Sequence, residues 1–223
     1  MPILAHRGAS SGPQNSIEAF RDAVRLGAAG IELDVQTASS GHLMVYHDLA
    51  VPGVGPIPEL EIDQIRAAKL SNGETIPTLG ETLQAIAAAS AQYGRQEFVV
   101  WIELKTLPPS ADPSLFRAIE DADRVVRCAV HSFDHRLIRR LATARPTVPY
   151  GVLSASYPVD PISQLTAAGA GTLWQEWRLI DRTLVDVIHQ HGARIIAWTV
   201  RDEAIARRLV DFGVDELCAD WPW

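Results

Sequence analysis

The sequence predicts one α/β domain over residues 1–223, built as a closed (β/α)8 TIM barrel of parallel strands and outer helices. Three observations lead to this prediction: the length of 223 residues, eight short apolar or β-branched runs along the whole chain, and amphipathic stretches between most of them. Alternating strands and helices are typical of a parallel sheet. Eight such units in about 200–250 residues favour a closed barrel. A doubly wound open sheet is the alternative.

The eight expected strands are short, and each is rich in apolar residues. They are separated by segments long enough for a helix, which the crossover between parallel strands requires. In chain order they are Ile3–Ala5, Gly30–Val35, Phe98–Leu104, Val125–Val130, Val148–Leu153, Thr172–Gln175, Arg194–Val200 and Glu216–Ala219.

Capping residues mark the expected helix ends. Asn15 with Glu18, and Thr78 with Glu81, have the spacing of an N-cap and its reciprocal acid. We therefore interpret Asn15 as a cap rather than a catalytic residue. Four glycines stand where helical periodicity stops shortly before a strand, as glycines that end helices do: Gly27, Gly169, Gly192 and Gly213.

One segment interrupts the alternation. An extended run at His42–Tyr46 follows the second strand, then a Pro- and Gly-rich loop at Val51–Pro58 and a partly helical piece at Glu61–Leu70. We expect a short insertion over about residues 49–73 on the side of the barrel where such enzymes keep their active sites.

Composition excludes several classes of protein. No apolar run approaches the roughly 20 residues needed to cross a bilayer, and the N-terminus does not resemble a signal peptide, so we expect a cytoplasmic protein without membrane insertion. The net charge is −7 without a Lys/Arg run, which argues against nucleic acid as a partner. Cys128 and Cys218 are expected to be buried thiols, because they form neither a disulfide framework nor a CxxC metal site. The oligomeric state stays open.

Carboxylates occupy unusual positions in the second and third strands. The period of two places Glu32 and Asp34 on one face of their strand, and Glu103 and Lys105 on one face of the next. Buried carboxylates this close would repel one another unless a cation joined them. Three carboxylates without a cysteine or histidine cluster favour one hard divalent cation, Mg²⁺ or Ca²⁺, at Glu32, Asp34 and Glu103.

The ordered set of motifs resembles the glycerophosphodiester phosphodiesterase family. The strings are HRGAS from His6, PQNS, GIELDVQ, VYHD and WIELK, followed by HSF at Phe133, WTV at Trp198 and the closing Asp220-Trp221-Pro222. The resemblance covers nearly the whole chain. It implies a (β/α)8 barrel that hydrolyses glycerophosphodiesters, as its small-molecule substrate, to sn-glycerol 3-phosphate and an alcohol.

The resemblance also implies roles for individual residues. It implies that Glu32, Asp34 and Glu103 bind the metal, that His6 and His47 form the acid–base pair, and that Arg7 and Lys105 bind the substrate phosphate. Two histidines that titrate near neutral pH suit proton transfer to and from the reacting oxygens. Either histidine can be the first base, and either water or the glycerol 2-hydroxyl can attack first, the latter through a cyclic phosphate.

Other interpretations stay open for part of the site and for the function. His131 and Trp198 either line the substrate pocket or fill the barrel, with Trp198 favoured as an apolar wall. A lysophospholipase D-type phosphodiesterase on the same scaffold is one alternative function. A non-catalytic barrel that binds a phosphorylated ligand is another.

Overall fold

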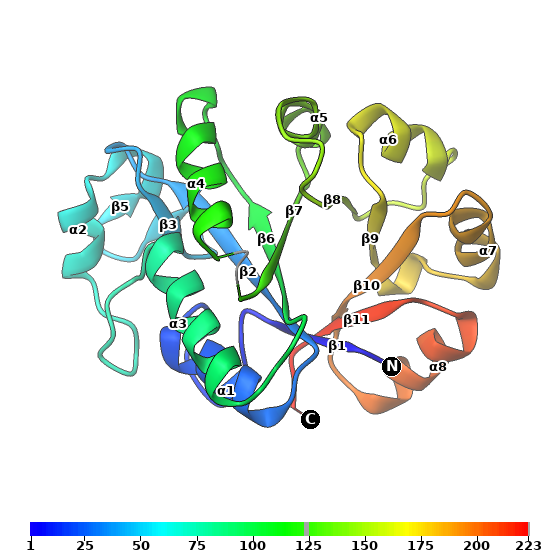
Figure 1. Ribbon diagram of the computed structural model, residues 1–223, viewed down its shortest axis with the longest axis horizontal. Helices are drawn as coiled ribbons and strands as arrows, with labels where there is room; N and C mark the ends of the chain where they lie inside the picture. Colours follow the sequence, from blue (N-terminus) through cyan, green and yellow to red (C-terminus); the bar gives the residue numbers. More distant parts are fainter. Residues whose placement is uncertain (123–124, 223) are drawn as a thin grey trace.

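Eight parallel strands close into a barrel with helices around the outside, as predicted (Figure 1). The computed structural model describes residues 1–122 and 125–222. Closure is complete because β1 pairs with both β2 and β11. The barrel strands are β1 (Ile3–His6), β2 (Gly30–Thr37), β6 (Val99–Leu104), β7 (Arg127–Ser132), β8 (Tyr150–Ser154), β9 (Thr172–Glu176), β10 (Arg194–Val200) and β11 (Glu216–Ala219).

The outer helices cover the apolar outward faces of these strands. On β2, for example, Ile31, Leu33 and Val35 are fully buried in the layer between sheet and helices. The helices are α1 (Ile17–Leu26), α3 (Leu79–Gln92), α4 (Asp112–Ala122), α5 (His135–Ala144), α6 (Pro161–Ala168), α7 (Arg182–Gln190) and α8 (Glu203–Phe212), with short 3-10 turns η2 (Pro109–Ala111) and η3 (Trp177–Leu179).

The helix ends confirm most of the capping prediction. Thr78 and Glu81 form the reciprocal capping box at the start of α3. All four glycines adopt a left-handed conformation at helix ends. The assignment of Asn15 as a cap was wrong: Ser16 caps α1, its hydroxyl accepting the Ala19 N–H at 3.0 Å. Asn15 is instead buried inside the barrel mouth.

One strand begins later than predicted, because the first residues of its apolar run are not part of the sheet. The strand expected from Val125 begins only at Arg127. The N–H groups of Val125 and Val126 both donate to the carbonyl of Ala122, the last residue of α4, so these two residues lie in a turn before the strand.

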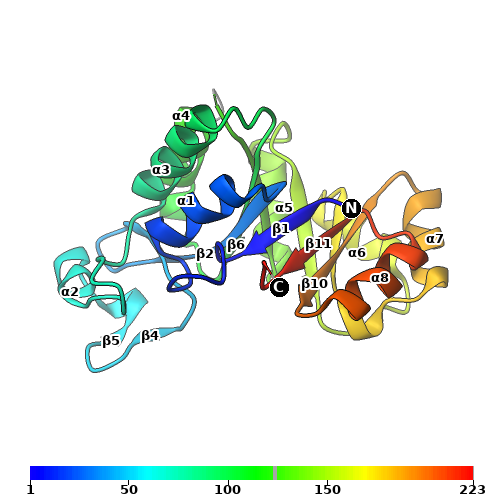
Figure 2. The ribbon, with the colours of Figure 1, turned by 90° about the horizontal axis from the view of Figure 1, so that it is seen from below.

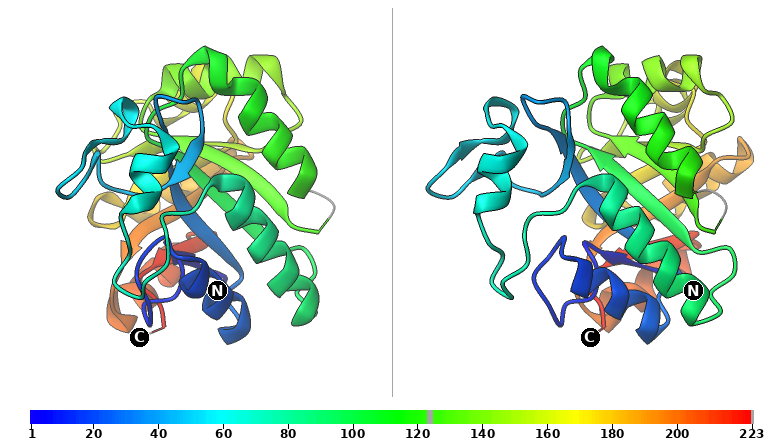
Figure 3. Two further views of the ribbon diagram at one scale, coloured as in Figure 1. Left: turned by 90° about the vertical axis from the view of Figure 1, so that its left-hand side faces the viewer. Right: turned by 60° about the vertical axis from the view of Figure 1, so that its left-hand side comes forward.

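The insertion lies to one side of the barrel (Figures 2 and 3). It contains β3 (Leu43–Val45), which runs antiparallel to the end of β2, a small hairpin of β4 (Ala50–Val51) and β5 (Gly55–Pro56), η1 (Ile57–Glu59) and α2 (Ile62–Ala67). The expected loop therefore includes a two-stranded ribbon. Its apolar side chains form a core of their own, which includes Met44, Ile57, Ile65 and Ile76.

Side chains fill the barrel interior below its mouth. Strands contribute Leu4, Trp101, Ala129, Leu153, Trp174, Ile196 and Cys218 to one apolar cluster. Polar residues of the inward faces therefore gather at the carboxyl ends of the strands. Within the described part of the chain, no helix has the length and apolar composition needed to cross a bilayer.

The contact between β1, β2 and β6 leaves no room for a side chain at Gly30. A Cβ there would lie 2.4 Å from the carbonyl oxygen of Val99 and 2.7 Å from Leu4 Cδ2. We predict that Gly30→Ala lowers the free energy of unfolding by about 1–3 kcal/mol or more, measured by urea denaturation.

Gly80→Ala is the matched control, because a Cβ at Gly80 on α3 meets no atom within 4 Å. It should leave stability unchanged or raise it by up to about 1 kcal/mol. Equal stability of the two variants would contradict the close approach at Gly30.

Candidate active site

Strand register brings the polar inward residues to one level of the barrel. His6 on β1 pairs with Glu32 on β2, and Asp34 on β2 pairs with Glu103 on β6. Glu103 in turn pairs with His131 on β7. Residues far apart in the sequence thus form a continuous polar layer at the barrel mouth.

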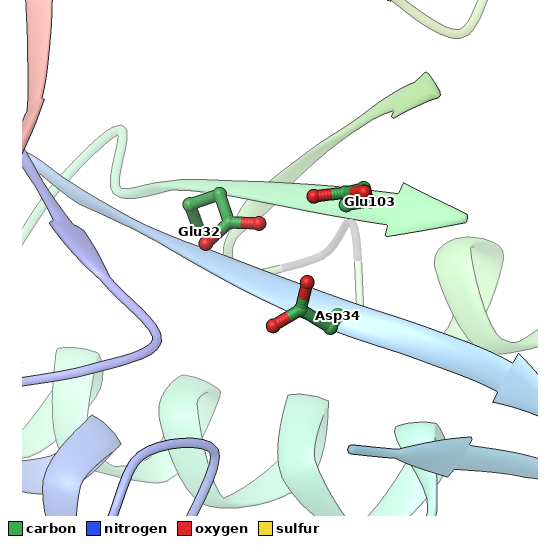
Figure 4. Close-up of side chains that lie close together, drawn as sticks. All are labelled: Glu32, Asp34 and Glu103. Atoms are coloured by element: carbon green, nitrogen blue, oxygen red, sulfur yellow. The ribbon is translucent and has the colours of Figure 1, made fainter. Parts of the chain in front are cut away.

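Three carboxylates form the centre of this layer. Glu32, Asp34 and Glu103 each offer an oxygen, and these oxygens lie within 4.8 Å of one another (Figure 4). All three side chains are buried. Within the described residues this is the one group of three or more acidic, histidine or cysteine side chains with metal-ligand spacing. The prediction that they converge is confirmed.

Asp34 is the carboxylate that the protein stabilises most strongly. Its oxygens contact Arg7 Nε at 2.9 Å and Lys105 Nζ at 3.0 Å, and accept a hydrogen bond from Asn15 Nδ2 at 2.8 Å. Burial alone would raise the pKa of Asp34, but the two cations and the Asn15 hydrogen bond outweigh it and hold that pKa below its usual range. Asp34 is therefore ionised.

The negative charges of Glu32 and Glu103 have fewer nearby cations and hydrogen-bond donors than that of Asp34. Burial, reinforced by the charge of Asp34, raises the pKa of each to about 7. Lys105 Nζ contacts Glu103 Oε1 at 2.5 Å, whereas Glu32 has histidines at 3.7 and 4.0 Å as its nearest ionic neighbours. Near neutral pH these two carboxyls hold protons that a cation could replace.

The loop between β1 and α1 has unusual backbone angles at Arg7 and Asn15, two of the partners of Asp34. Arg7 and Asn15 have φ angles of 57° and 60°, in the left-handed region that non-glycine residues seldom adopt. Between them Gly8 packs so closely that a Cβ would lie 2.7 Å from the Ala19 Cβ. The strained turn is thus held by tight packing against α1.

His6 is oriented by an acid at the opposite end of the sequence. Its Nδ1 lies 2.6 Å from Asp220 Oδ1, and the second oxygen of Asp220 accepts from Arg201 Nε at 2.9 Å. The hydrogen bond to His6 and, further, the one to Arg201 lower the pKa of Asp220 to about 2, so it is a carboxylate. His6 therefore carries its proton on Nδ1 and directs Nε2 toward Glu32, 4.0 Å away.

His47 reaches the site from the insertion side. The buried amide of Gln36 donates to the carbonyl oxygens of Tyr46, His47 and Asp48, which fixes this segment against β2. His47 Nδ1 lies 2.8 Å from Asp48 Oδ1. Both histidines thus have an acidic partner at Nδ1, but the partner of His47 is mostly exposed.

A cavity of about 110 Å³ opens beside the carboxylates. Its wall includes Phe133 and Trp198, whose rings meet edge to face at 5.5 Å. A larger hollow of about 690 Å³ lies between α6 and α7, but it holds no comparable acid–base cluster among the described residues. The sequence-predicted residues that line the cavity beside the carboxylates, besides Glu32 and Glu103, are His6, Arg7, His47, Lys105, His131 and Trp198.

Three supporting residues were not predicted from the sequence. Gln36 could have been found, because it continues the period of two through Glu32 and Asp34 on the same face of β2. Asn15 and Asp220 gave no such pattern. Asn15 acts through its contact with Asp34 on the neighbouring strand β2, and Asp220 through a contact with His6 that barrel closure makes possible.

A family comparison identifies relatives of the whole chain. The model of the glycerophosphoryl diester phosphodiesterase family matches residues 6–222. The chain is 32% identical to a glycerophosphodiester phosphodiesterase of Caldanaerobacter subterraneus subsp. tengcongensis, over 99% of this chain and 94% of the relative. It is 26% identical to a glycerophosphodiester phosphodiesterase of Bacillus altitudinis, over 99% and 94%.

Solved structures show the same fold. An Oleispira antarctica phosphodiesterase, solved with the product sn-glycerol-3-phosphate, superposes with a TM-score of 0.86 at 22% identity, over 100% of this chain and 94% of that one. A glycerophosphodiester phosphodiesterase of Parabacteroides distasonis gives a TM-score of 0.83 at 24% identity, over 99% and 93%.

The raised carboxyl pKa values predict how stability depends on pH without divalent ions. Glu32 and Glu103 have pKa values raised from 4.5 to about 7, so the folded protein binds their protons more tightly than the unfolded chain. Their contribution to stability is complete below the unfolded value and is lost as pH rises through about 7. In EDTA, the free energy of unfolding should therefore fall between about pH 5 and about pH 8.

Glu32→Gln removes one of the two carboxyls and should make this fall shallower in urea denaturation. Glu120→Gln is the control, because Glu120 is an exposed carboxylate on α4 paired with Arg145. A slope unchanged by Glu32→Gln would show that the carboxyl cluster does not titrate in this way.

Proposed function

The chain belongs to the glycerophosphoryl diester phosphodiesterase family, and from this premise we propose that it hydrolyses small glycerophosphodiesters to sn-glycerol 3-phosphate and an alcohol with one bound divalent cation. The carboxylate triad flanked by two histidines at the barrel mouth is the observation that carries this proposal. The Oleispira relative, which binds sn-glycerol-3-phosphate on the same barrel, supports the identity of the product.

The donor set suits a hard cation. Glu32, Asp34 and Glu103 offer only carboxylate oxygens, the ligands that Mg²⁺ and Ca²⁺ prefer. Glu32 Oε2 is buried without a hydrogen-bond partner among the described residues, which leaves it available for coordination. When bound, the cation supplies Lewis acidity that polarises a phosphoryl oxygen.

Charge balance favours a phosphodiester anion in this site. Once all three carboxyls are ionised, as coordination of a cation requires, their charge against Arg7 and Lys105 leaves one negative charge. A divalent cation turns this into one positive charge, which a phosphodiester monoanion neutralises. Arg7 offers a planar fork and Lys105 a compact ammonium, so both can hold phosphate oxygens as charge develops on them.

His6 and His47 provide the proton transfers. Each makes its hydrogen bond to an acid through Nδ1, which leaves Nε2 for the reacting oxygens. One histidine removes the proton of the attacking oxygen, from water or from the glycerol 2-hydroxyl, while the other protonates the departing alkoxide. Where the 2-hydroxyl attacks first, water then opens the cyclic phosphate with the same two histidines. Asp220 is a positioning residue that holds His6 in the required tautomer.

The surroundings of the cavity favour small polar substrates. Phe133 and Trp198 form an apolar wall for the glycerol carbons, and His131 lies deeper in the cavity. An open hollow of about 590 Å³ shares Glu103, Lys105 and Phe133 with this cavity and continues to the charged side chains of Asp134 and Arg136. Most apolar side chains of the insertion pack into a core of their own and are not free to bind an acyl chain. Leu49 and Val54, at the β4–β5 hairpin, are its exposed large apolar side chains.

The direct test is hydrolysis of sn-glycero-3-phosphocholine with and without EDTA. We expect release of sn-glycerol 3-phosphate that EDTA abolishes and excess Mg²⁺ or Ca²⁺ restores. Activity that persists in EDTA would contradict the cation requirement. A higher kcat/KM for lysophosphatidylcholine would favour a lysophospholipase D, and no turnover of either substrate would favour a binding protein.

Variants of the two histidines separate chemistry from folding. His6→Ala and His47→Ala should each lower kcat by about 10²–10⁴-fold, the usual scale for a positioned acid or base. Their thermal stability should change little, because both side chains lie at the barrel mouth. His191→Ala, an exposed histidine after α7, is the control and should keep normal kcat. Near-normal kcat in either active-site variant would refute the acid–base pair.

A further inference from the structure

His131 on β7 is a buried polar side chain without a hydrogen-bond partner among the described residues. Only 1% of the residue is exposed, and it lines the catalytic cavity. Neither ring nitrogen makes a hydrogen bond to any described residue. A buried polar group left unpaired destabilises a fold, so an apolar residue would fill this position better if packing were its only purpose.

The surroundings of His131 keep its ring neutral. Its centroid lies 4.0 Å from that of Trp174 and 5.6 Å from that of Trp101, which meets it edge-on. Burial in these aromatic surroundings lowers the pKa of His131 to about 3. A neutral imidazole has one N–H donor and one acceptor nitrogen to offer.

His131 does not belong to the ligand set itself. Only Glu32, Asp34 and Glu103, among the described residues, bring their donor atoms within 4.8 Å of one another. The carboxylate oxygen nearest to His131 belongs to one of these ligands: its Nε2 lies 3.7 Å from Glu32 Oε1. That distance is slightly longer than a hydrogen bond.

Glu32 is also the carboxylate that lacks a donor. Asp34 is held by Arg7, Asn15 and Lys105, and Glu103 is held by Lys105. No described residue donates a hydrogen bond to the Glu32 side chain. His6 cannot do so in its resting tautomer, because its proton lies on Nδ1 toward Asp220. Of the two histidine nitrogens within 4.0 Å of this carboxylate, His131 Nε2 is the nearer, at 3.7 Å.

We propose that His131 is a positioning residue whose Nε2–H donates to Glu32 Oε1 and orients that carboxylate for cation binding. A small rotation of either side chain closes the 3.7 Å separation. Metal-binding carboxylates are commonly fixed by such outer hydrogen bonds. The inference rests on the proposed cation-dependent function, and it assigns the unpaired histidine a role in building the cation site.

A matched pair of variants tests the donor. His131→Gln keeps an N–H near the position of Nε2, and His131→Met has nearly the same size without a donor. Calorimetric titration of the metal-free proteins with Mg²⁺ alone, and separately with Ca²⁺ alone, measures affinity without substrate. We expect His131→Met to lose about 10–100-fold in affinity, the usual cost of losing an outer hydrogen bond, and His131→Gln to recover most of it.

Stability supplies a second readout. The metal-free methionine variant should be at least as stable as the parent protein, since it removes a buried unpaired polar group. Trp101→Phe changes packing beside His131 and should leave cation affinity unchanged. If the methionine variant does not fold, His131→Phe, which keeps a ring between the tryptophans, replaces it in the comparison.

Different outcomes test the donor role of His131 and the cation-dependent function. Normal cation affinity in His131→Met, or equal losses in the glutamine and methionine variants, would overturn the donor role while leaving the cation site intact. Absence of Mg²⁺ and Ca²⁺ binding by the parent protein would instead refute the cation-dependent function, and the role of His131 with it.

Discussion

Mutual repulsion among Glu32, Asp34 and Glu103 is the constraint that shapes the rest of the site. These three carboxylates are buried and have oxygens within 4.8 Å of one another. Ionising all of them in a medium of low polarity has a high free-energy cost. The protein compensates one of them, Asp34, with Arg7, Lys105 and Asn15. It leaves the other two with pKa values near 7. Bound protons or a bound cation must therefore neutralise Glu32 and Glu103.

The two histidines are built into the molecule by different means. His6 stands on a barrel strand, and Asp220, itself held by Arg201, fixes it from the end of the last strand. His47 stands on the insertion, and the buried amide of Gln36 holds its backbone. The site thus depends both on closure between the first and last strands and on attachment of the insertion to β2.

Local sequence patterns predicted the barrel, the triad and most cavity-lining residues, because each depends on short-range periodicity or on the end of a strand. The period of two is sufficient to place Glu32 and Asp34 on one face of β2. Asn15 was misassigned because an amide before a helix has the same local pattern whether it caps the helix or turns inward. Asp220 acts on His6 across a sequence separation of 214 residues, and only barrel closure brings the two together.

The most direct test of this account is the number of protons released when a divalent cation binds. Calorimetric titration of the metal-free protein at about pH 6, in buffers of different ionisation enthalpy, measures stoichiometry and proton release together. The account predicts one cation per chain and a net release of protons, since Glu32 and Glu103 are largely protonated there and must ionise to coordinate. Binding without proton release, or no binding, would contradict it.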